Sequence, residues 1–322
     1  MPASHNLRIA YFGTPEFAAT ILNDLVTKHY NIVGVVTAPD RPSGRGQKLQ
    51  ATAVKTVAEA HNLPLLQPEK LKNETFLTEL AAWKADLFIV VAFRMLPKEV
   101  WAMPRLGTFN LHAALLPDFR GAAPIQHAIM CGCTETGATT FLLDEHIDTG
   151  KILLQEKVEI TNTETGGSLH DKLMHLGCKL VPQTIDYLWE NGPEAAIDQN
   201  AKANSLMRPA PKIFKQDREI LFTQNTATQI ERKVRALSPS PCAFATWHIA
   251  GEAHEVKIHS AAQLPTTNLK AGEVYIHPDN RILVGTTNGD IELLELQMPS
   301  KRRMSAQDLL RGLRLPNPGI FQ

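Results

Sequence analysis

The sequence has few cysteines, and none of them stands in a pattern that binds metal or forms a redox pair. The 322 residues include four, and no two form a C-x-x-C pair. Cys131 and Cys133 lie close together, but no Cys or His follows them at zinc-finger spacing. We therefore expect no structural metal. The remaining two, Cys178 and Cys242, complete a set of free thiols that suits the reducing cytoplasm.

Long hydrophobic runs are also missing. The most apolar stretch, Leu87 to Phe93, is much shorter than the roughly 20 residues that cross a bilayer. The first residues, MPASHNLRIAYFG, lack the apolar core of a signal peptide. With 43% hydrophobic and 20% charged residues, the composition is that of an ordinary soluble protein. The length suits two domains, and we expect a cytoplasmic chain without a membrane partner.

The chain has no net charge, which excludes a strongly basic or acidic protein. The charges are nevertheless unevenly distributed. From Arg208 to the end, 15 Lys and Arg stand against 11 Asp and Glu, whereas the other 207 residues hold 18 against 22. A modestly basic C-terminal part is compatible with polyanion binding, and chance surface charge explains the same count equally well.

The first half alternates between apolar strands and helical patterns. A parallel sheet covered on both faces produces this alternation, and such sheets bind ligands beyond the carboxyl ends of their strands. Thr14 is expected to cap the first helix, with Pro15 at its first position. The expected strands cover residues 7–12, 32–37, 63–66 and 87–92, with helices near residues 17–25, 54–58 and 73–83.

The pattern changes after Trp189. Residues 190–211 are polar and broken by prolines, which predicts a linker. A helix near residues 230–237 and several short β-like runs then predict a small antiparallel barrel of the OB-like kind. The fold class is therefore α/β. The expected division is a Rossmann-like domain at 1–190, a linker at 191–211 and a smaller β-barrel domain at 212–322.

Two motifs follow expected strands. Gly13-Thr-Pro-Glu-Phe17 lacks the G-x-G-x-x-G pattern, so dinucleotide binding is unsupported and Gly13 is interpreted as a tight turn. In Thr108-Phe-Asn110-Leu-His112, strand alternation puts Asn110 and His112 on one face. A carboxamide beside an imidazole can stabilise an acyl oxyanion and move a proton, although a histidine in such a pattern is more often structural.

Two further segments allow both a structural and a functional interpretation. In Asp144-Glu-His-Ile-Asp148-Thr-Gly150, an acidic side chain can cap a local turn, or Asp148 can orient the His112 ring. Spacing alone does not choose among the three carboxylates. The polar stretch 38–49 is either a solvated connection or a flexible loop whose cations grip phosphate.

Taken together, these motifs resemble the methionyl-tRNA formyltransferase family over nearly the whole chain. The landmarks, in order, are FGTPEFA, APDRPSGRGQKL, VVAF, NLHAALLPDFRGAAPIQ, DEHIDTG, VRALSP and MSAQDLL. The asparagine, histidine and aspartate are shared by folate-dependent formyltransferases. The arginine-containing loop and the C-terminal domain favour tRNA as the acceptor.

The resemblance implies a reaction and its residues. A formyl group passes from 10-formyltetrahydrofolate to the amine of initiator methionyl-tRNA, for translation initiation. Asn110 and protonated His112 would stabilise the oxyanion, while Asp148 would position His112 and a water that relays protons. No metal is required. Folate contacts are expected from Phe93, Leu115, Leu116, Pro117 and Asp144.

Two departures from the family pattern concern the folate pocket. Ala114 stands where the family commonly has Ser, so no side-chain contact carries over to that position. The stretch Phe93-Arg94-Met95 replaces a longer one that contains tyrosine and glycine.

The tRNA contacts are expected from two groups of cations. Lys301 to Arg303 is equally compatible with a solvated charge run. The expected residues are Arg41, Arg45 and Lys48 in the loop, with Arg232, Lys233, Arg235, Lys301, Arg302 and Arg303 in the C-terminal domain.

Other functions share parts of this pattern. A formyltransferase acting on a sugar-nucleotide amine would keep the three catalytic residues without needing the arginine loop, and a hydrolase of formyltetrahydrofolate would use water as the acceptor. A glycinamide ribonucleotide formyltransferase would not need the second domain. A catalytically inactive RNA-binding protein would not need Asn110, His112 and Asp148 together. We expect a monomer.

Overall fold

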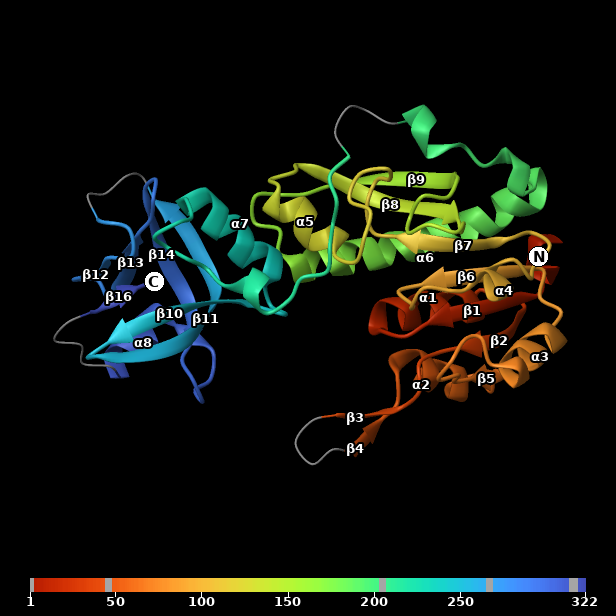
Figure 1. Cartoon of the computed structure of the whole chain (residues 1–322), viewed down its shortest axis with the longest axis horizontal. Helices are drawn as coiled ribbons and strands as arrows, with labels where there is room; N and C mark the ends of the chain where they lie inside the picture. Colours follow the sequence, from red (N-terminus) through yellow and green to blue (C-terminus); the bar gives the residue numbers. More distant parts are fainter. Residues whose placement is uncertain (1–2, 44–47, 203–206, 265–268, 313–317) are drawn as a thin grey trace. The chain divides into compact units, whose positions relative to one another are not determined.

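The computed structural model describes residues 3–43, 48–202, 207–264, 269–312 and 318–322 (Figure 1). Contacts between residues divide the chain into two compact units. Unit 1 comprises residues 1–121, 135–159 and 170–210, and unit 2 comprises residues 122–134, 160–169 and 211–322. Two segments from the first half of the chain therefore belong to unit 2, whereas the sequence suggested a division at a single linker.

Unit 1 is built on a seven-stranded sheet with the order β5-β2-β1-β6-β7-β8-β9. The pairs from β5 to β7 are parallel, which confirms the expected α/β sheet. Two antiparallel strands, β8 and β9, extend it at one edge. The bounds are β1 Ile9–Gly13, β2 Ile32–Val36, β5 Leu65–Leu66, β6 Leu87–Val91, β7 Thr108–His112, β8 Glu135–Leu142 and β9 Ile152–Glu159.

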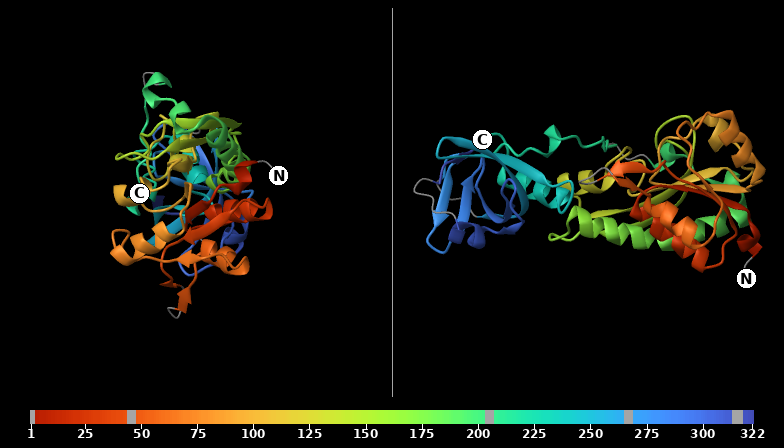
Figure 2. Two further views of the ribbon diagram at one scale, coloured as in Figure 1. Left: turned by 90° about the vertical axis from the view of Figure 1, so that its right-hand side faces the viewer. Right: turned by 90° about the horizontal axis from the view of Figure 1, so that it is seen from below.

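Helices cover both faces of this sheet (Figure 2). On one face, a Cβ at Gly177 of α6 would lie 2.7 Å from side-chain carbons of Ile21 in α1 and Leu111 in β7. On the other face, Phe76 of α3 belongs to an apolar cluster with Phe88 and other strand residues. The bounds are η1 Ala3–Asn6, α1 Glu16–Thr27, α2 Ala53–Ala60, α3 Glu74–Ala82, α4 Lys98–Trp101 and α6 Gly166–Asn191.

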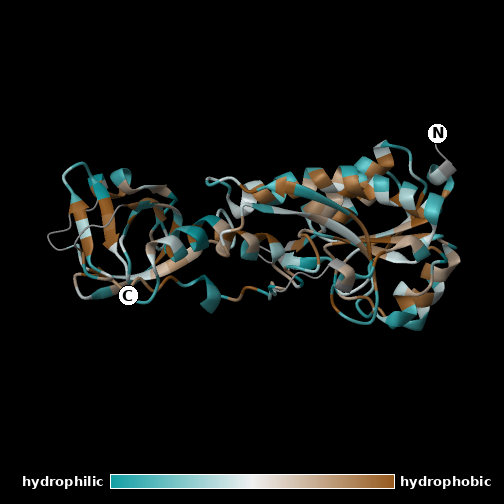
Figure 3. Ribbon diagram, turned by 90° about the horizontal axis from the view of Figure 1, so that it is seen from above, coloured by the Kyte–Doolittle hydropathy of each residue, from teal (hydrophilic) through white to brown (hydrophobic). Residues whose placement is uncertain are grey.

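The long helix α6 has no counterpart among the expected helices. Polar and apolar residues alternate along the helices of unit 1, as expected for helices with one face on a sheet (Figure 3). Within the described ranges, no helix is both long and apolar enough to cross a membrane.

The turn between β1 and α1 differs from the expectation. The helix begins at Glu16, so Pro15 occupies the N-cap position, and no side chain caps this end. Thr14 is therefore not the cap, and the Pro15 carbonyl oxygen accepts from the N–H groups of Ala18 and Ala19. Gly13 is required by packing, because a Cβ there would lie 2.6 Å from the Ala18 Cβ and 3.1 Å from the Val91 carbonyl oxygen.

The stretch expected to be a polar loop forms a short hairpin at its base. Strand β3 (Arg41–Ser43) pairs antiparallel with β4 (Lys48–Gln50). Asp40, just before the hairpin, bonds Lys55 at 2.6 Å and Gln67 at 2.8 Å. The hydrogen bonds from both neighbours lower the pKa of Asp40. The base of the hairpin is therefore fastened to unit 1.

The segment after α6 packs on unit 1 in its described parts. It contains two short 3-10 helices, η2 (Pro193–Ala195) and η3 (Gln199–Lys202). Ile197 pairs with Ile152 of β9, and Pro209 forms a bridge with Arg120. These residues of the expected linker are thus held by backbone contacts.

Unit 2 contains an antiparallel sheet with the order β12-β13-β14-β11-β10-β16. A bridge between Glu273 and Ile320 joins its two ends, which confirms a nearly closed barrel. Its core includes Trp247 and Phe321, whose rings stack at 5.0 Å. The bounds are α5 Pro124–Met130, η4 Gln216–Arg218, α7 Ala227–Leu237, β10 Ala243–Ile249, β11 Glu252–Leu264, β12 Val274–His277, β13 Arg281–Gly285, β14 Asp290–Gln297, β15 Met304–Ser305, α8 Ala306–Gly312 and β16 Ile320–Phe321.

Candidate active site

Two polar residues of β7 lie on the same face of the sheet, as strand alternation requires. Asn110 pairs with Val90 of β6 and Phe141 of β8, which places it inside the sheet. His112 ends the strand opposite Thr139. The Asn110 carboxamide is partly exposed and forms no hydrogen bond within the described part of the chain. It is therefore able to donate a hydrogen bond to a bound group.

The His112 ring is buried and held at one nitrogen. The residue is 6% exposed, and Nε2 lies 2.9 Å from the Phe119 carbonyl oxygen. Because a carbonyl oxygen only accepts, Nε2 must carry the hydrogen of this bond. In the neutral ring, Nδ1 is then the unprotonated nitrogen, and it lies 3.8 Å from Asp148 Oδ2. His112 therefore gains and loses its proton at Nδ1.

The neutral ring is the resting form of His112. Burial lowers its pKa because the imidazolium loses contact with water, and this outweighs the opposite effects of Asp148 and the Phe119 carbonyl. The resulting pKa lies below the usual value of about 6.5. A protonated ring therefore requires that a proton be delivered to Nδ1.

This shift predicts how the stability of the protein depends on pH. As the pH falls, the unfolded chain binds a proton at His112 before the native state does. The contribution to stability is therefore complete above about pH 6.5 and is lost as the pH falls through the lowered native pKa. We expect His112→Gln, which does not titrate, to lose its free energy of unfolding less steeply between about pH 7 and 5. Urea unfolding measures this, and equal slopes for the two proteins would contradict it.

The Asp148 carboxylate is placed by an unusual turn. Its φ of 55° is left-handed, which few non-glycine residues adopt. Oδ2 accepts a hydrogen bond of 2.8 Å from the Gly121 N–H. Gly150 is required because a Cβ there would lie 1.6 Å from the Leu142 carbonyl oxygen. The turn brings this carboxylate of the acidic motif beside His112.

The loop after β7 is fastened by two polar side chains from neighbouring strands. Thr139 Oγ1 donates to the Ala114 carbonyl oxygen at 2.6 Å and accepts from the Leu116 N–H at 3.0 Å. Gln155 Nε2 donates to the Leu116 carbonyl oxygen at 2.7 Å. These bonds hold the backbone that follows His112.

The expected folate residues in this loop differ in exposure. The Leu116 side chain is buried with Phe141 and Ile152, and both of its backbone polar groups are paired. Leu116 therefore helps to build the scaffold of the loop. Leu115 and Pro117 are partly exposed.

The two other expected folate residues lie on separate loops. Phe93 follows β6, and its ring packs edge-on against Phe12 at 5.9 Å between centroids. Asp144 is exposed and accepts hydrogen bonds from the His146 N–H and the Thr149 hydroxyl. Asp144 thus caps its own turn, which is the structural interpretation of this motif.

Three of the expected tRNA-binding cations on unit 2 are bound to protein oxygens. Arg235 pairs with Glu231 at 2.7 Å and is 15% exposed. Lys233 donates to a backbone carbonyl oxygen at 2.8 Å, and burial lowers its pKa. Arg303 forms an ion pair with Glu295. These charges are less available to phosphate than those of Lys301 and Arg302, which are exposed and form no ion pair among the described residues.

The other four cations expected to bind tRNA are Arg232 in unit 2 and Arg41, Arg45 and Lys48 in the stretch 38–49. Arg232 lies beside Gly132, where an added Cβ would be 2.2 Å from its guanidinium carbon. Arg41 is exposed on β3. Arg45 lies outside the described residues, and for Lys48 the description covers only the backbone of β4.

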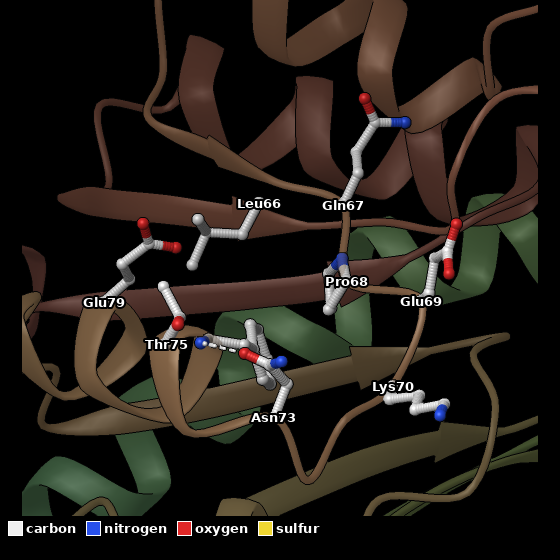
Figure 4. Close-up of a pocket in the computed structure, with 9 residues that line it drawn as sticks. Leu66, Gln67, Pro68, Glu69, Lys70, Asn73, Thr75 and Glu79 are labelled. Atoms are coloured by element: carbon white, nitrogen blue, oxygen red, sulfur yellow. Dashed lines mark hydrogen bonds between the residues drawn. The ribbon is translucent and has the colours of Figure 1, made fainter.

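A cavity of about 410 Å³ lies near the carboxyl end of β5 and contains none of the expected site residues (Figure 4). Its lining includes Gln67, Glu69, Lys70 and Asn73, and the Asn73 side chain caps α3 by accepting from the Phe76 N–H. No group of three or more His, Cys, Asp or Glu side chains is arranged to hold a metal ion in the described part of the chain. Asn110, His112 and Asp148 thus remain the candidate site.

Known proteins resemble this chain over nearly its whole length. The family described as formyl transferase matches residues 7–185, and the formyl transferase C-terminal domain matches residues 212–314. A methionyl-tRNA formyltransferase of Bacteroides fragilis is 48% identical over 312 residues, which are 96% of each chain. One of Flavobacterium johnsoniae is 46% identical over 95% of this chain and 96% of the relative. The chain belongs to the methionyl-tRNA formyltransferase family. The resemblance found in the sequence is therefore confirmed, and with it the enzyme class, formyltransferase.

Solved structures of other proteins share the fold of this family member. WlaRD, a sugar 3N-formyl transferase, matches with a TM-score of 0.64 and 17% identity over 92% of this chain and 99% of its own. HypX from Aquifex aeolicus, in complex with tetrahydrofolic acid, matches with a TM-score of 0.62 and 19% identity over 95% of this chain. The chain spans 47% of the length of HypX.

Several residues around this site were not expected from the sequence. Thr139 and Gln155 fasten the loop after β7, and Gln199 and Arg208 contact the loops around His112 and Asp148. The threonines within the otherwise apolar end of β8, Thr139 and Thr140, could have indicated Thr139. Nothing local indicates Gln199 or Arg208, because their partners lie about 50 to 90 positions away.

Proposed function

We propose that this chain transfers the formyl group of 10-formyltetrahydrofolate to the free amine of methionyl initiator tRNA, forming N-formylmethionyl-tRNA. The observation that carries the proposal is Asp148 at 3.8 Å from the titrating nitrogen of His112, on the face that also holds Asn110. The names of relatives at 46–48% identity support the acceptor. The tetrahydrofolic acid in the HypX complex supports a folate donor. All three residues come from one chain, so a monomer suffices, and translation initiation places it in the cytoplasm.

The reaction moves one proton, and His112 is placed to carry it. The amine nitrogen bonds to the formyl carbon and the bond from that carbon to N10 of the folate breaks. The amine loses one proton and N10 gains one. Nδ1 of neutral His112 takes the proton of the attacking amine, and Asp148 stabilises the imidazolium that forms. The same nitrogen then returns the proton to the leaving N10.

Asn110 supplies the stabilisation of negative charge. During the attack, the formyl oxygen becomes an oxyanion that needs hydrogen-bond donors in fixed positions. The Asn110 carboxamide sits on a central strand and has donors available. The folate would lie against Phe93, Leu115, Pro117 and Asp144 at the ends of the strands, where open α/β sheets bind ligands.

The identity of the acceptor is tested by offering acceptors of different chemical classes in separate assays. The purified chain with 10-formyltetrahydrofolate is given methionyl initiator tRNA, a sugar-nucleotide amine, or no acceptor, and formylated product and tetrahydrofolate are measured. We expect product with the tRNA and little turnover otherwise. Efficient formylation of the sugar-nucleotide amine, or release of formate without an acceptor, would replace this proposal with the corresponding function.

We further propose that residues 1–190 carry the chemistry and that residues 212–322 mainly hold the tRNA, with residues 191–211 connecting them. The candidate catalytic residues belong to unit 1, whereas exposed Lys301 and Arg302 belong to unit 2. We also assign Arg41, Lys48 and Arg232 to the tRNA, together with Arg45, which lies outside the described residues. Lys233, Arg235 and Arg303 have the smaller share because their charges already bind protein oxygens.

Phosphate contacts predict a salt dependence that mutation can reduce. Each neutralised phosphate adds a slope of about −0.9 to the dependence of log affinity on log salt. The double variant Lys301→Ala/Arg302→Ala should therefore bind tRNA more weakly, with a slope that is less steep by up to about 1.8. Binding titrations at several salt concentrations measure this, and kcat at saturating tRNA should be unchanged.

A matched control uses another exposed cation of unit 2. Arg311 of α8 pairs with Asp308 on its own helix and is 70% exposed. Arg311→Ala removes a positive charge without removing a proposed contact, so its salt slope should equal that of the wild type. If the double variant also kept the wild-type slope, Lys301 and Arg302 would be a solvated charge run.

A further inference from the structure

The described parts of residues 199–210 contact the loop that carries Asp148 and the loop whose carbonyl holds His112. All of these contacts lie within unit 1. Gln199 reaches the turn of Asp148, and Arg208 reaches the loop of Phe119, whose carbonyl holds His112. The reaction described above assigns no task to either residue.

Gln199 is buried and uses both ends of its carboxamide. It is 2% exposed. Nε2 donates to the carbonyl oxygens of Asp148 at 3.0 Å and Gly150 at 2.7 Å. Oε1 accepts from Arg120 at 2.7 Å and 3.1 Å. One side chain therefore joins the turn of Asp148 to the loop that contains Arg120.

The joined elements are those that hold the Asp148 carboxylate. Its left-handed backbone is strained and persists only when surrounding contacts enforce it. Gln199 binds the carbonyl of this strained residue. Gly121, which holds the carboxylate, directly follows Arg120, the other partner of Gln199. Gln199 thus bonds the backbone of Asp148 directly and, through the Arg120 side chain, the loop that supplies the donor to the Asp148 carboxylate.

Arg208 acts on the His112 side of the site. Its carbonyl oxygen accepts from the Phe119 N–H at 2.7 Å, and its guanidinium lies 4.5 Å from the Phe119 ring centroid. The guanidinium also forms an ion pair with Asp118. Phe119 has a left-handed φ of 57°, so it too needs external contacts. These contacts fix the carbonyl that binds His112 Nε2 at 2.9 Å.

We propose that Gln199 and Arg208 are positioning residues for formyl transfer, which hold Asp148 and His112 at the separation at which a proton moves between substrate and Nδ1. The proposal rests on the proposed function. Neither residue touches the reacting atoms. Each acts through the loop that it binds. Both lie in the described parts of residues 199–210.

The first test is Gln199→Met, which keeps the length of the side chain and removes its hydrogen bonds. A misplaced catalytic pair costs on the order of tenfold to a hundredfold in kcat. We expect a loss of this size, with the KM for 10-formyltetrahydrofolate within about twofold of wild type. The low-pH limb of the kcat profile should also move to lower pH, because Asp148 is the charged group that raises the pKa of His112 and it would lie farther away.

Thr184→Val provides the matched control. Thr184 is fully buried and bonds Thr140 at 2.8 Å; Thr140 pairs with Leu111, so by strand alternation it faces the side of the sheet opposite to Asn110 and His112. Its loss should lower thermal stability but leave kcat and the pH limb as in the wild type. A Gln199→Met protein that is folded and shows wild-type kcat and an unmoved limb would overturn the proposal, as would a change no different from that of Thr184→Val.

A second pair keeps the test decisive if Gln199→Met does not fold. The Arg208 side chain is 41% exposed, so Arg208→Met leaves no buried cavity. We expect a severalfold lower kcat with little change in Tm, and partial rescue in Arg208→Lys, which keeps a charge for Asp118. Equal kcat in Arg208→Met and wild type would overturn the proposal. The wild type in the same assay separates the two hypotheses, because a wild type without formyl transfer refutes the proposed function and not the positioning geometry.

Discussion

Replacing His112 with alanine should lower kcat for formyl transfer by on the order of a hundredfold or more. The change removes the nitrogen that takes the amine proton, whereas the surfaces expected to bind folate remain. Affinity for 10-formyltetrahydrofolate should therefore change little. Steady-state kinetics with charged initiator tRNA, together with a separate folate-binding titration, measures the two quantities.

The control for this variant is another histidine of the same unit. His146 is exposed, lies in the acidic motif and has no role in the proposed reaction. His146→Ala should have wild-type kcat. Added imidazole should restore part of the activity of His112→Ala, because it can enter the space of the lost ring. Near wild-type turnover in His112→Ala would show that the buried histidine is structural.

Asp148→Asn should be similarly severe, although it keeps the shape of the side chain. The amide oxygen can take the place of Oδ2, the atom that accepts from the Gly121 N–H and lies 3.8 Å from His112 Nδ1. The side chain beside Nδ1 is then neutral, so no carboxylate stabilises the imidazolium that forms when Nδ1 takes the proton. We expect kcat to fall on the order of a hundredfold or more, as in other sites where a histidine loses its carboxylate partner.

Glu145→Gln tests whether the loss of any charge in this motif has the same effect. Glu145 is exposed and pairs with Lys98 at 2.7 Å, away from His112. We expect wild-type kcat in this variant. The assignment of Asp148 would fail if the two substitutions lowered kcat equally, or if Asp148→Asn retained most of the wild-type rate.

The strand that carries the site could be predicted because its signal is local. Asn110 and His112 are two residues apart on an apolar strand, so their common face follows from backbone geometry alone. The choice of Asp148 among three carboxylates did not follow from spacing. It came from the resemblance to a family, and the left-handed turn with Gly150 behind it gives the physical reason.

One other expectation was wrong, and further features were not expected at all where contacts between distant segments decide the structure. Thr14 has the side chain of a helix cap, but α1 begins at Glu16. Pro15 therefore occupies the N-cap position, and Thr14 lies one residue before it. The segment 190–211 has the composition of a linker, yet Ile197 and Pro209 form bridges with residues of unit 1. Composition reports the absence of a regular pattern and does not show whether a partner lies elsewhere in the chain.

The sequence by itself determined the alternation of strands and helices, the barrel, the family and the two polar residues of β7. These depend on periodicity and on residues that are close in the chain. Only the tertiary structure decided that Nε2 of His112 is the fixed nitrogen and Nδ1 the one that titrates. It also decided that Gln199 and Arg208 meet the loops of Asp148 and Phe119. The physical reason is that hydrogen bonds between loops are directional and short, so they depend on how segments far apart in the chain approach one another.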